Sequence, residues 1–114
     1  MHELSIVMSI VDLAEEQVKK HQAREVDRIE LDIGTLAGIE FDALDFAWDA
    51  GVKHSVLASA ERQINRIEGK MRCMKCGREF TVTEPFQPCP DCNDYLNEFI
   101  QGKELRVKSL TMKF

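Results

Sequence analysis

Residues 73–92 read CMKCGREFTVTEPFQPCPDC, and this stretch decides how the chain divides. Two C-x-x-C pairs, Cys73 with Cys76 and Cys89 with Cys92, stand twelve residues apart. Each pair suits a tight turn whose amide groups can donate to sulfur, and the two turns are expected to face each other across a short hairpin. Four thiolates with tetrahedral spacing favour zinc, so the pattern predicts a structural zinc ion held by all four cysteines. An electron-transfer iron site and a redox-active dithiol are the alternatives.

The segment around these pairs differs in composition from the rest of the chain. Residues 69–102 hold all four cysteines, all three prolines and three of the glycines, with little periodicity. A segment of fewer than about 40 residues normally needs a metal ion or disulfides to fold. We therefore expect a zinc-binding domain at 69–102, inserted into an α/β domain made of residues 1–68 and 103–114.

The flanking sequence shows the periodicities of two helices and three strands. Apolar residues recur at three- and four-residue steps from Leu4 to about Lys20, and a second apolar stripe covers Asp42–His54. In Val26–Ile33, apolar and polar residues alternate, as they do in a half-buried strand. Residues 61–68 and 104–114 show the same alternation with one irregularity each, which a β-bulge would explain. The simplest architecture is an α+β fold: two helices on one face of a small three-stranded sheet, with a zinc-ribbon-like cysteine lobe inserted before the last strand.

Composition and motifs argue against several classes of function. The 114 residues carry a net charge of −5, and residues 69–102 hold four basic against five acidic side chains, which disfavours nucleic acid. The longest early apolar stretch is too short to span a bilayer, so we expect no membrane insertion and a cytoplasmic protein. No Ser/His/Asp set, phosphate loop or pair of catalytic acids stands out, so an enzyme is not predicted. A zinc-ribbon module that binds nucleic acid or protein remains the alternative function.

The first residues, MHE, offer a second metal site. The Met1 amine, the His2 amide nitrogen and the His2 imidazole can form fused chelate rings around one ion, and such nitrogen-rich ligation suits Ni(II) or Cu(II). Glu3 is placed to add an oxygen. From these residues alone, a histidine near a chain terminus is more often an exposed residue without a ligand role.

Four stretches resemble the HypA/HybF family of hydrogenase maturation proteins: MHELSIV at the start, IELDIGTLAGIE at 29–40, the C-x-x-C-G and C-P-x-C pairs, and ELRVKSLTM at 104–112. The resemblance runs from end to end. It implies a metallochaperone that delivers nickel to the large subunit of [NiFe]-hydrogenase with a HypB-type GTPase. It further implies that His2 is the nickel ligand, that Glu3 tunes nickel binding, and that the four cysteines bind zinc. The α/β domain of residues 1–68 and 103–114 is then the nickel-binding domain.

Two departures from the family pattern affect the expected sites. Glu40 stands where some members have an aspartate that contributes to nickel binding. Gly77, Arg78 and Asn93 stand where some members have a histidine close after a C-x-x-C pair, so zinc-site behaviour that depends on such a histidine is not expected here. The sequence leaves open a homodimer and a further role in supplying nickel to urease.

Overall fold

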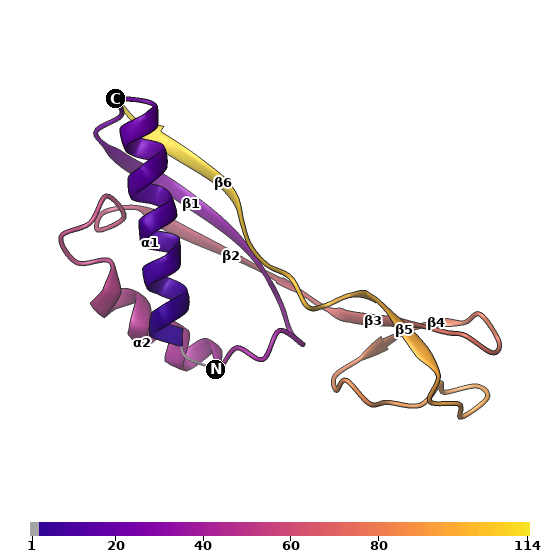
Figure 1. The fold of residues 1–114 in the computed structure, drawn as a ribbon. Coiled ribbons are helices and arrows are strands. Elements are labelled where there is room, and N and C mark those ends of the chain that lie inside the picture. The colour runs from indigo at the N-terminus through magenta and orange to yellow at the C-terminus, as the bar shows by residue number, and fades with distance from the viewer. Residues whose placement is uncertain (1–2) are drawn as a thin grey trace. The chain divides into compact units, whose positions relative to one another are not determined.

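The structure is a computed structural model, and it describes residues 3–114. Within these residues, two helices and six strands follow one another (Figure 1). In chain order they are α1 (Glu3–Lys20), β1 (Glu25–Gly34), α2 (Phe41–Gly51), β2 (Glu61–Ile67), β3 (Gly69–Cys73), β4 (Glu79–Val82), β5 (Asn97–Gln101) and β6 (Leu105–Lys113).

The strands form two three-stranded sheets, ordered β2-β1-β6 and β4-β3-β5. Together with the two helices, they confirm the predicted mixed α/β fold with a small sheet and an inserted cysteine segment. The second sheet extends the predicted hairpin, because β5 pairs with β3 as a third antiparallel strand. Among the described residues, neither helix has the length and apolar character needed to span a membrane.

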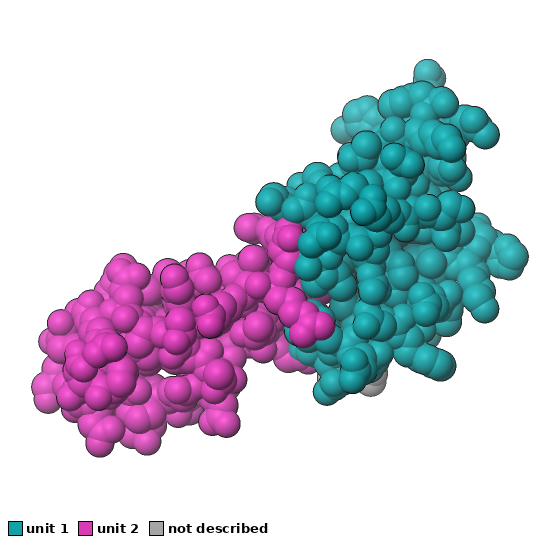
Figure 2. All heavy atoms as spheres, turned by 180° about the vertical axis from the view of Figure 1, so that it is seen from behind, with its two compact units in different colours: residues 1–31, 39–64, 107–114 teal, residues 32–38, 65–106 magenta. Residues whose placement is uncertain are grey.

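The chain separates into two compact units (Figure 2). The helical unit comprises the described residues up to 31, residues 39–64 and residues 107–114. The cysteine unit comprises residues 32–38 and 65–106. The assignment of nickel binding to one part of the chain and zinc binding to the other stays a prediction.

Apolar stripes on both helices and on β1 form the core of the helical unit. Figure 1 shows α1 in front of β1 and β2, and α1 also contacts α2. The buried core side chains of these three elements that belong to this unit are Val7, Ile10, Val11, Ala14, Val18, Val26, Ile29, Leu31, Leu44, Ala47 and Trp48. The helical residues follow the predicted three- and four-residue steps, and Ile29 and Leu31 follow the predicted strand alternation.

α2 is shorter than the sequence predicts. The expected helix continues to His54, but the observed one ends at Gly51. His54 has a φ of +64°, in the left-handed region, and this conformation cannot continue a right-handed helix. Val52, just after the helix, is still buried, so the apolar stripe predicted its burial correctly but overestimated the length of the helix.

The core of the cysteine unit contains cysteines as well as apolar side chains. Met71, Phe80 and Val82 are buried together with Cys73 and Cys89. Residues 32–38 join this unit through backbone hydrogen bonds, because the amide of residue 35 donates to the carbonyl of residue 67 (2.9 Å) and that of residue 36 to the carbonyl of residue 102 (2.8 Å). These bonds connect positions more than thirty residues apart along the chain.

Candidate metal centre

The four cysteines converge on one point of the cysteine unit. Their Sγ atoms all lie within 4.8 Å of one another. The Sγ atoms of Cys73 and Cys92 are 3.4 Å apart, and those of Cys76 and Cys89 are 3.6 Å apart. Four sulfurs bound tetrahedrally at the usual zinc–sulfur length would stand about 3.8 Å from one another. The arrangement therefore fits a single tetrahedral metal ion, and the predicted four-cysteine cluster is present.

Two similar turns present the sulfurs. In the first, the Gly77 amide donates to the Cys73 carbonyl (2.9 Å), and in the second the Asn93 amide donates to the Cys89 carbonyl (2.9 Å). The residue after each C-x-x-C pair is left-handed, with φ of +79° at Gly77 and +63° at Asn93. Glycine and asparagine are the residues that adopt this conformation at least cost. The role of Asn93 was missed from the sequence, although its position matches that of Gly77 in the other pair.

Burial differs among the four ligands. Cys73, at the end of β3, and Cys89 are buried, whereas Cys92 is half-buried and Cys76 is exposed. Two ligands thus belong to the core and two lie toward its surface. A metal ion bound here would join the β3 strand to the loop that precedes β5.

The sulfurs also differ in their affinity for protons. Hydrogen bonding from the Cys76 backbone amide, whose nitrogen lies 3.5 Å from the Cys73 sulfur, lowers the pKa of Cys73 to about 7. A backbone hydrogen bond at Asp94 lowers the pKa of Cys92, but contact with the other thiols, Cys73 first, and burial outweigh it and raise that pKa to about 12. One sulfur is therefore partly ionised near neutral pH, while another must lose a proton to bind a metal.

The predicted nickel residues fall partly outside the described structure. Met1 and His2 lie outside the described residues. Glu3 begins α1, and its Oε2 accepts a hydrogen bond from the backbone amide of Glu40 at 3.3 Å. Glu40 is the N-cap residue of α2 and its side chain is exposed. The fold thus brings together two of the predicted residues that are 37 positions apart.

Comparison with known proteins agrees with this arrangement. Residues 1–112 match the HypA family, described as hydrogenase/urease nickel incorporation metallochaperones. The hydrogenase maturation factor HypA of Parabacteroides distasonis is 46% identical over 113 residues, covering 99% of this chain and 98% of the relative. The protein of the same name from Geobacter metallireducens is 39% identical, covering 99% of this chain and all of the relative.

A solved structure gives the same result. The solution structure of the Ni metallochaperone HypA from Helicobacter pylori superposes with a TM-score of 0.68 at 29% identity, covering 99% of this chain and 98% of that one. These matches confirm the resemblance inferred from the MHE start, the 29–40 stretch and the cysteine pairs. The chain belongs to the HypA family.

Proposed function

We propose that this chain, as a HypA-family nickel metallochaperone for hydrogenase maturation, binds Ni(II) at its first residues and transfers it to the large subunit of [NiFe]-hydrogenase. The full-length match to the family carries this proposal, together with a histidine at position 2 followed by Glu3. The family is described as nickel-incorporation metallochaperones, and this description supports the role of a carrier rather than an enzyme. A nucleic-acid-binding zinc ribbon is not favoured.

The nickel ligands are nitrogen atoms of the chain start. The Met1 amine, the His2 amide and the His2 imidazole would bind the ion, since such a set suits Ni(II). The hydrogen bond from the Glu40 amide to the Glu3 carboxylate holds a negative charge beside the first turn of α2. This supports a contribution of Glu3 and Glu40 to nickel binding. Glu3 and the exposed Glu40 carboxylate are the further candidate ligands.

Transfer would proceed by exchange of ligands at the chain start. A carrier must release its ion, and a terminal chelate can open one ligand at a time, unlike a closed four-thiolate site. Protons compete with the metal for the amine, amide and imidazole nitrogens, so nickel affinity should fall as the pH falls.

The cysteine site is proposed to hold a resident zinc ion rather than the nickel cargo. The separations of 3.4 and 3.6 Å between sulfurs support this, and so does a ligand set made only of thiolates. Zinc would supply cross-linking between the two cysteine turns, and no position would remain for a reacting water. Its role is to stabilise the cysteine unit and the surface that this unit offers to partners.

The expected partners are a HypB-type GTPase and the hydrogenase large subunit, in the cytoplasm. Membership of a hydrogenase maturation family supports partners in that pathway. The proposal includes a homodimer. The molecular mass of the untagged protein in solution tests it.

Nickel titration of His2→Gln tests the proposed site. The untagged, zinc-loaded variant should lose stoichiometric nickel binding in calorimetry at neutral pH and keep its zinc content, because glutamine removes the imidazole and leaves the cysteines intact. His21→Gln is the matched control, since His21 is an exposed histidine just after α1. It should titrate like the unmodified protein.

Two results would contradict the proposal. One is unchanged nickel stoichiometry and affinity in His2→Gln. The other is equal loss in His21→Gln, which would place the nickel elsewhere. Transfer is tested separately, by asking whether nickel-loaded protein activates a nickel-free large subunit while His2→Gln does not.

A further inference from the structure

In the described part of the chain, no strand lies beside the outer edge of β5. β5 is an edge strand of the β4-β3-β5 sheet, and it is antiparallel to β3. The Met74 amide donates to the Leu96 carbonyl (2.9 Å), so Leu96 and, by alternation, Glu98 direct their backbone groups toward β3. Asn97 and Phe99 therefore direct their N–H and C=O groups away from the sheet. Within residues 3–114, no backbone group pairs with them on that side.

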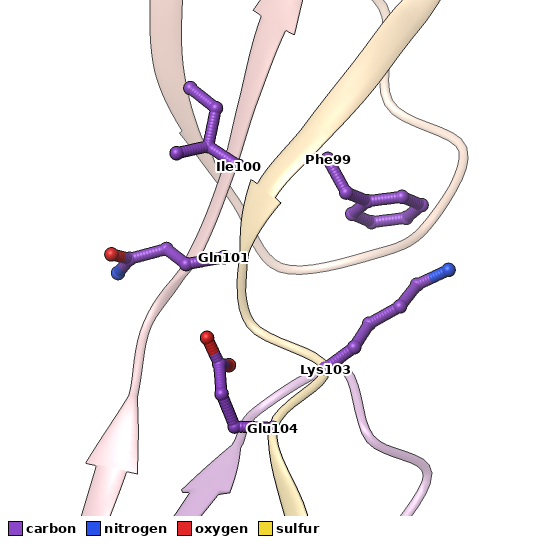
Figure 3. A pocket seen from close by; sticks show the side chains of 5 residues that line it. All are labelled: Phe99, Ile100, Gln101, Lys103 and Glu104. Atoms are coloured by element: carbon purple, nitrogen blue, oxygen red, sulfur yellow. The ribbon is translucent and has the colours of Figure 1, made fainter.

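Apolar side chains and an open cavity accompany this edge. Phe99 is 38% exposed and Ile100 is 39% exposed. In Figure 3 they project from opposite sides of the strand. A cavity of about 320 Å³ is lined by Phe99, Ile100, Gln101, Lys103 and Glu104. A strand added here would find unpaired backbone groups and apolar contacts on both of its faces.

The edge also carries a charge that no described carboxylate neutralises. The Lys103 ammonium lies 3.6 Å from the centroid of the Phe99 ring, and among residues 3–114 it has no ion-pair partner. Glu104 is engaged differently, because its Oε1 accepts a hydrogen bond from the Gly102 amide at 2.8 Å. Figure 3 shows Lys103 reaching toward Phe99, with Glu104 away from that ring. An acidic group is thus favoured on the Phe99 side of the strand and disfavoured near Glu104.

The other edge of the same sheet is more polar, because the cavity beside it is lined mainly by polar residues, with Phe80 and Pro90 as its apolar members. β4 presents Glu79 and Thr81 as exposed residues, whereas its apolar residues Phe80 and Val82 are buried. An added strand on β4 would meet mainly polar side chains. β4 is therefore a control for β5 within one sheet.

We propose that the outer edge of β5 binds an extended peptide segment of a partner protein by β-strand addition, with an acidic side chain of that segment placed at Lys103 and an apolar one against Phe99. Main-chain hydrogen bonds to Asn97 and Phe99 provide affinity in this mode of recognition, and the side-chain contacts provide specificity. The site is independent of nickel binding and goes beyond the proposed function.

The test is an NMR titration of the full-length, zinc-loaded, ¹⁵N-labelled protein. The probes are two capped peptides, TVEVTVT and its counterpart TVKVTVT, in which lysine replaces the glutamate. We expect saturable shifts centred on β5, with the acidic peptide binding about fivefold tighter, because the exposed Lys103 pair contributes modestly. Before peptide is added, the chemical shifts of β5 should not depend on protein concentration.

Four variants separate the contributions. Phe99→Ala removes the ring and keeps the outward amide, whereas Phe99→Pro removes both, so a further loss in the proline variant measures the main-chain bond. Thr81→Pro removes the corresponding outward amide of β4 and should leave binding unchanged. Lys103→Glu should reverse the preference between the two peptides. Phe99→Ala and Lys103→Glu keep the test valid if a proline variant fails to fold.

Several outcomes would overturn the inference. These are no saturable shifts with either peptide, binding that is lost equally in a folded Thr81→Pro variant, and an unchanged peptide preference in Lys103→Glu. Shifts on β5 that grow with protein concentration alone would also overturn it, since a second copy of the chain would then be the occupant.

Discussion

At the scale of single residues, Gly34 illustrates how closely two chain segments of the cysteine unit approach each other. A Cβ built on Gly34 would stand 1.9 Å from the carbonyl oxygen of Gly102. The amide of Gly34 also donates to the Glu104 carbonyl at 2.7 Å, so its backbone is held in place. Only glycine fits at this position without moving backbone atoms.

Gly34→Ala should lower the free energy of unfolding by about 3 kcal/mol or more, because the clash is with backbone rather than with a flexible side chain. Gly38→Ala is the matched control in the same segment. Gly38 has a φ of +78° and open space around its Cβ position, so alanine there should cost only about 1 kcal/mol of backbone strain. Urea denaturation of the zinc-loaded proteins measures both, and equal losses would contradict the argument.

At the scale of the elements, β1 carries a carboxylate that the alternation alone places on its polar face. Asp32 is nevertheless buried, at 4% exposure. Its two oxygens accept hydrogen bonds from Asn65 Nδ2 and Arg106 Nε, both at 2.9 Å. These partners lie 33 and 74 positions away in sequence, so nothing local in β1 indicates that Asp32 is covered.

Arg106→Met should lower the free energy of unfolding by about 1 to 2 kcal/mol, since it removes the ion pair of a buried carboxylate. The loss is no larger because the Arg106 side chain is 65% exposed and solvent screens its charge. Arg72→Met is the control: Arg72 pairs with Glu79 and Glu98, all three side chains are about half exposed, and the loss should stay below about 1 kcal/mol. Thermal unfolding of both variants measures the two losses of stability. A larger loss in Arg72→Met than in Arg106→Met would contradict the argument.

At the scale of the whole molecule, the cysteine site links metal content to pH. The pKa of Cys73 is lowered to about 7 and that of Cys92 is raised to about 12. The pKa of Cys76 is also raised: hydrogen bonding at Arg78 lowers it, but contact with the Cys89 thiol and burial outweigh this. In the metal-free protein at neutral pH, at least two of the ligands are therefore thiols.

Zinc binding near pH 7 should release at least two protons per ion, and zinc affinity should fall as the pH falls, because only thiolates bind the metal. Calorimetry in buffers of different ionisation enthalpy counts the protons, and competition with a chelator at pH 6 and pH 8 measures the affinity. Elemental analysis should find one zinc per chain. Binding that releases no protons, or an iron-type visible absorption spectrum, would exclude the zinc-thiolate site proposed here.

The features that depend on neighbouring residues could be predicted from the sequence. The stripes of α1, α2 and β1, and the spacing of Cys73, Cys76, Cys89 and Cys92, are each contained in about twenty residues or fewer. Periodicity and chelate spacing are local properties, so they predicted the helices, the central strand and the metal cluster. The MHE start indicated the family but leaves the nickel ligands as a prediction.

The contacts between distant segments could be found only in the folded protein. The tertiary structure brought Glu3 to the amide of Glu40, buried Asp32, and joined residues 32–38 to the cysteine unit. It also paired β5 with β3 and left the outer edge of β5 open beside Lys103. The physical reason is that these features arise from hydrogen bonds and packing between positions tens of residues apart, and no local pattern of residues encodes which of them come into contact.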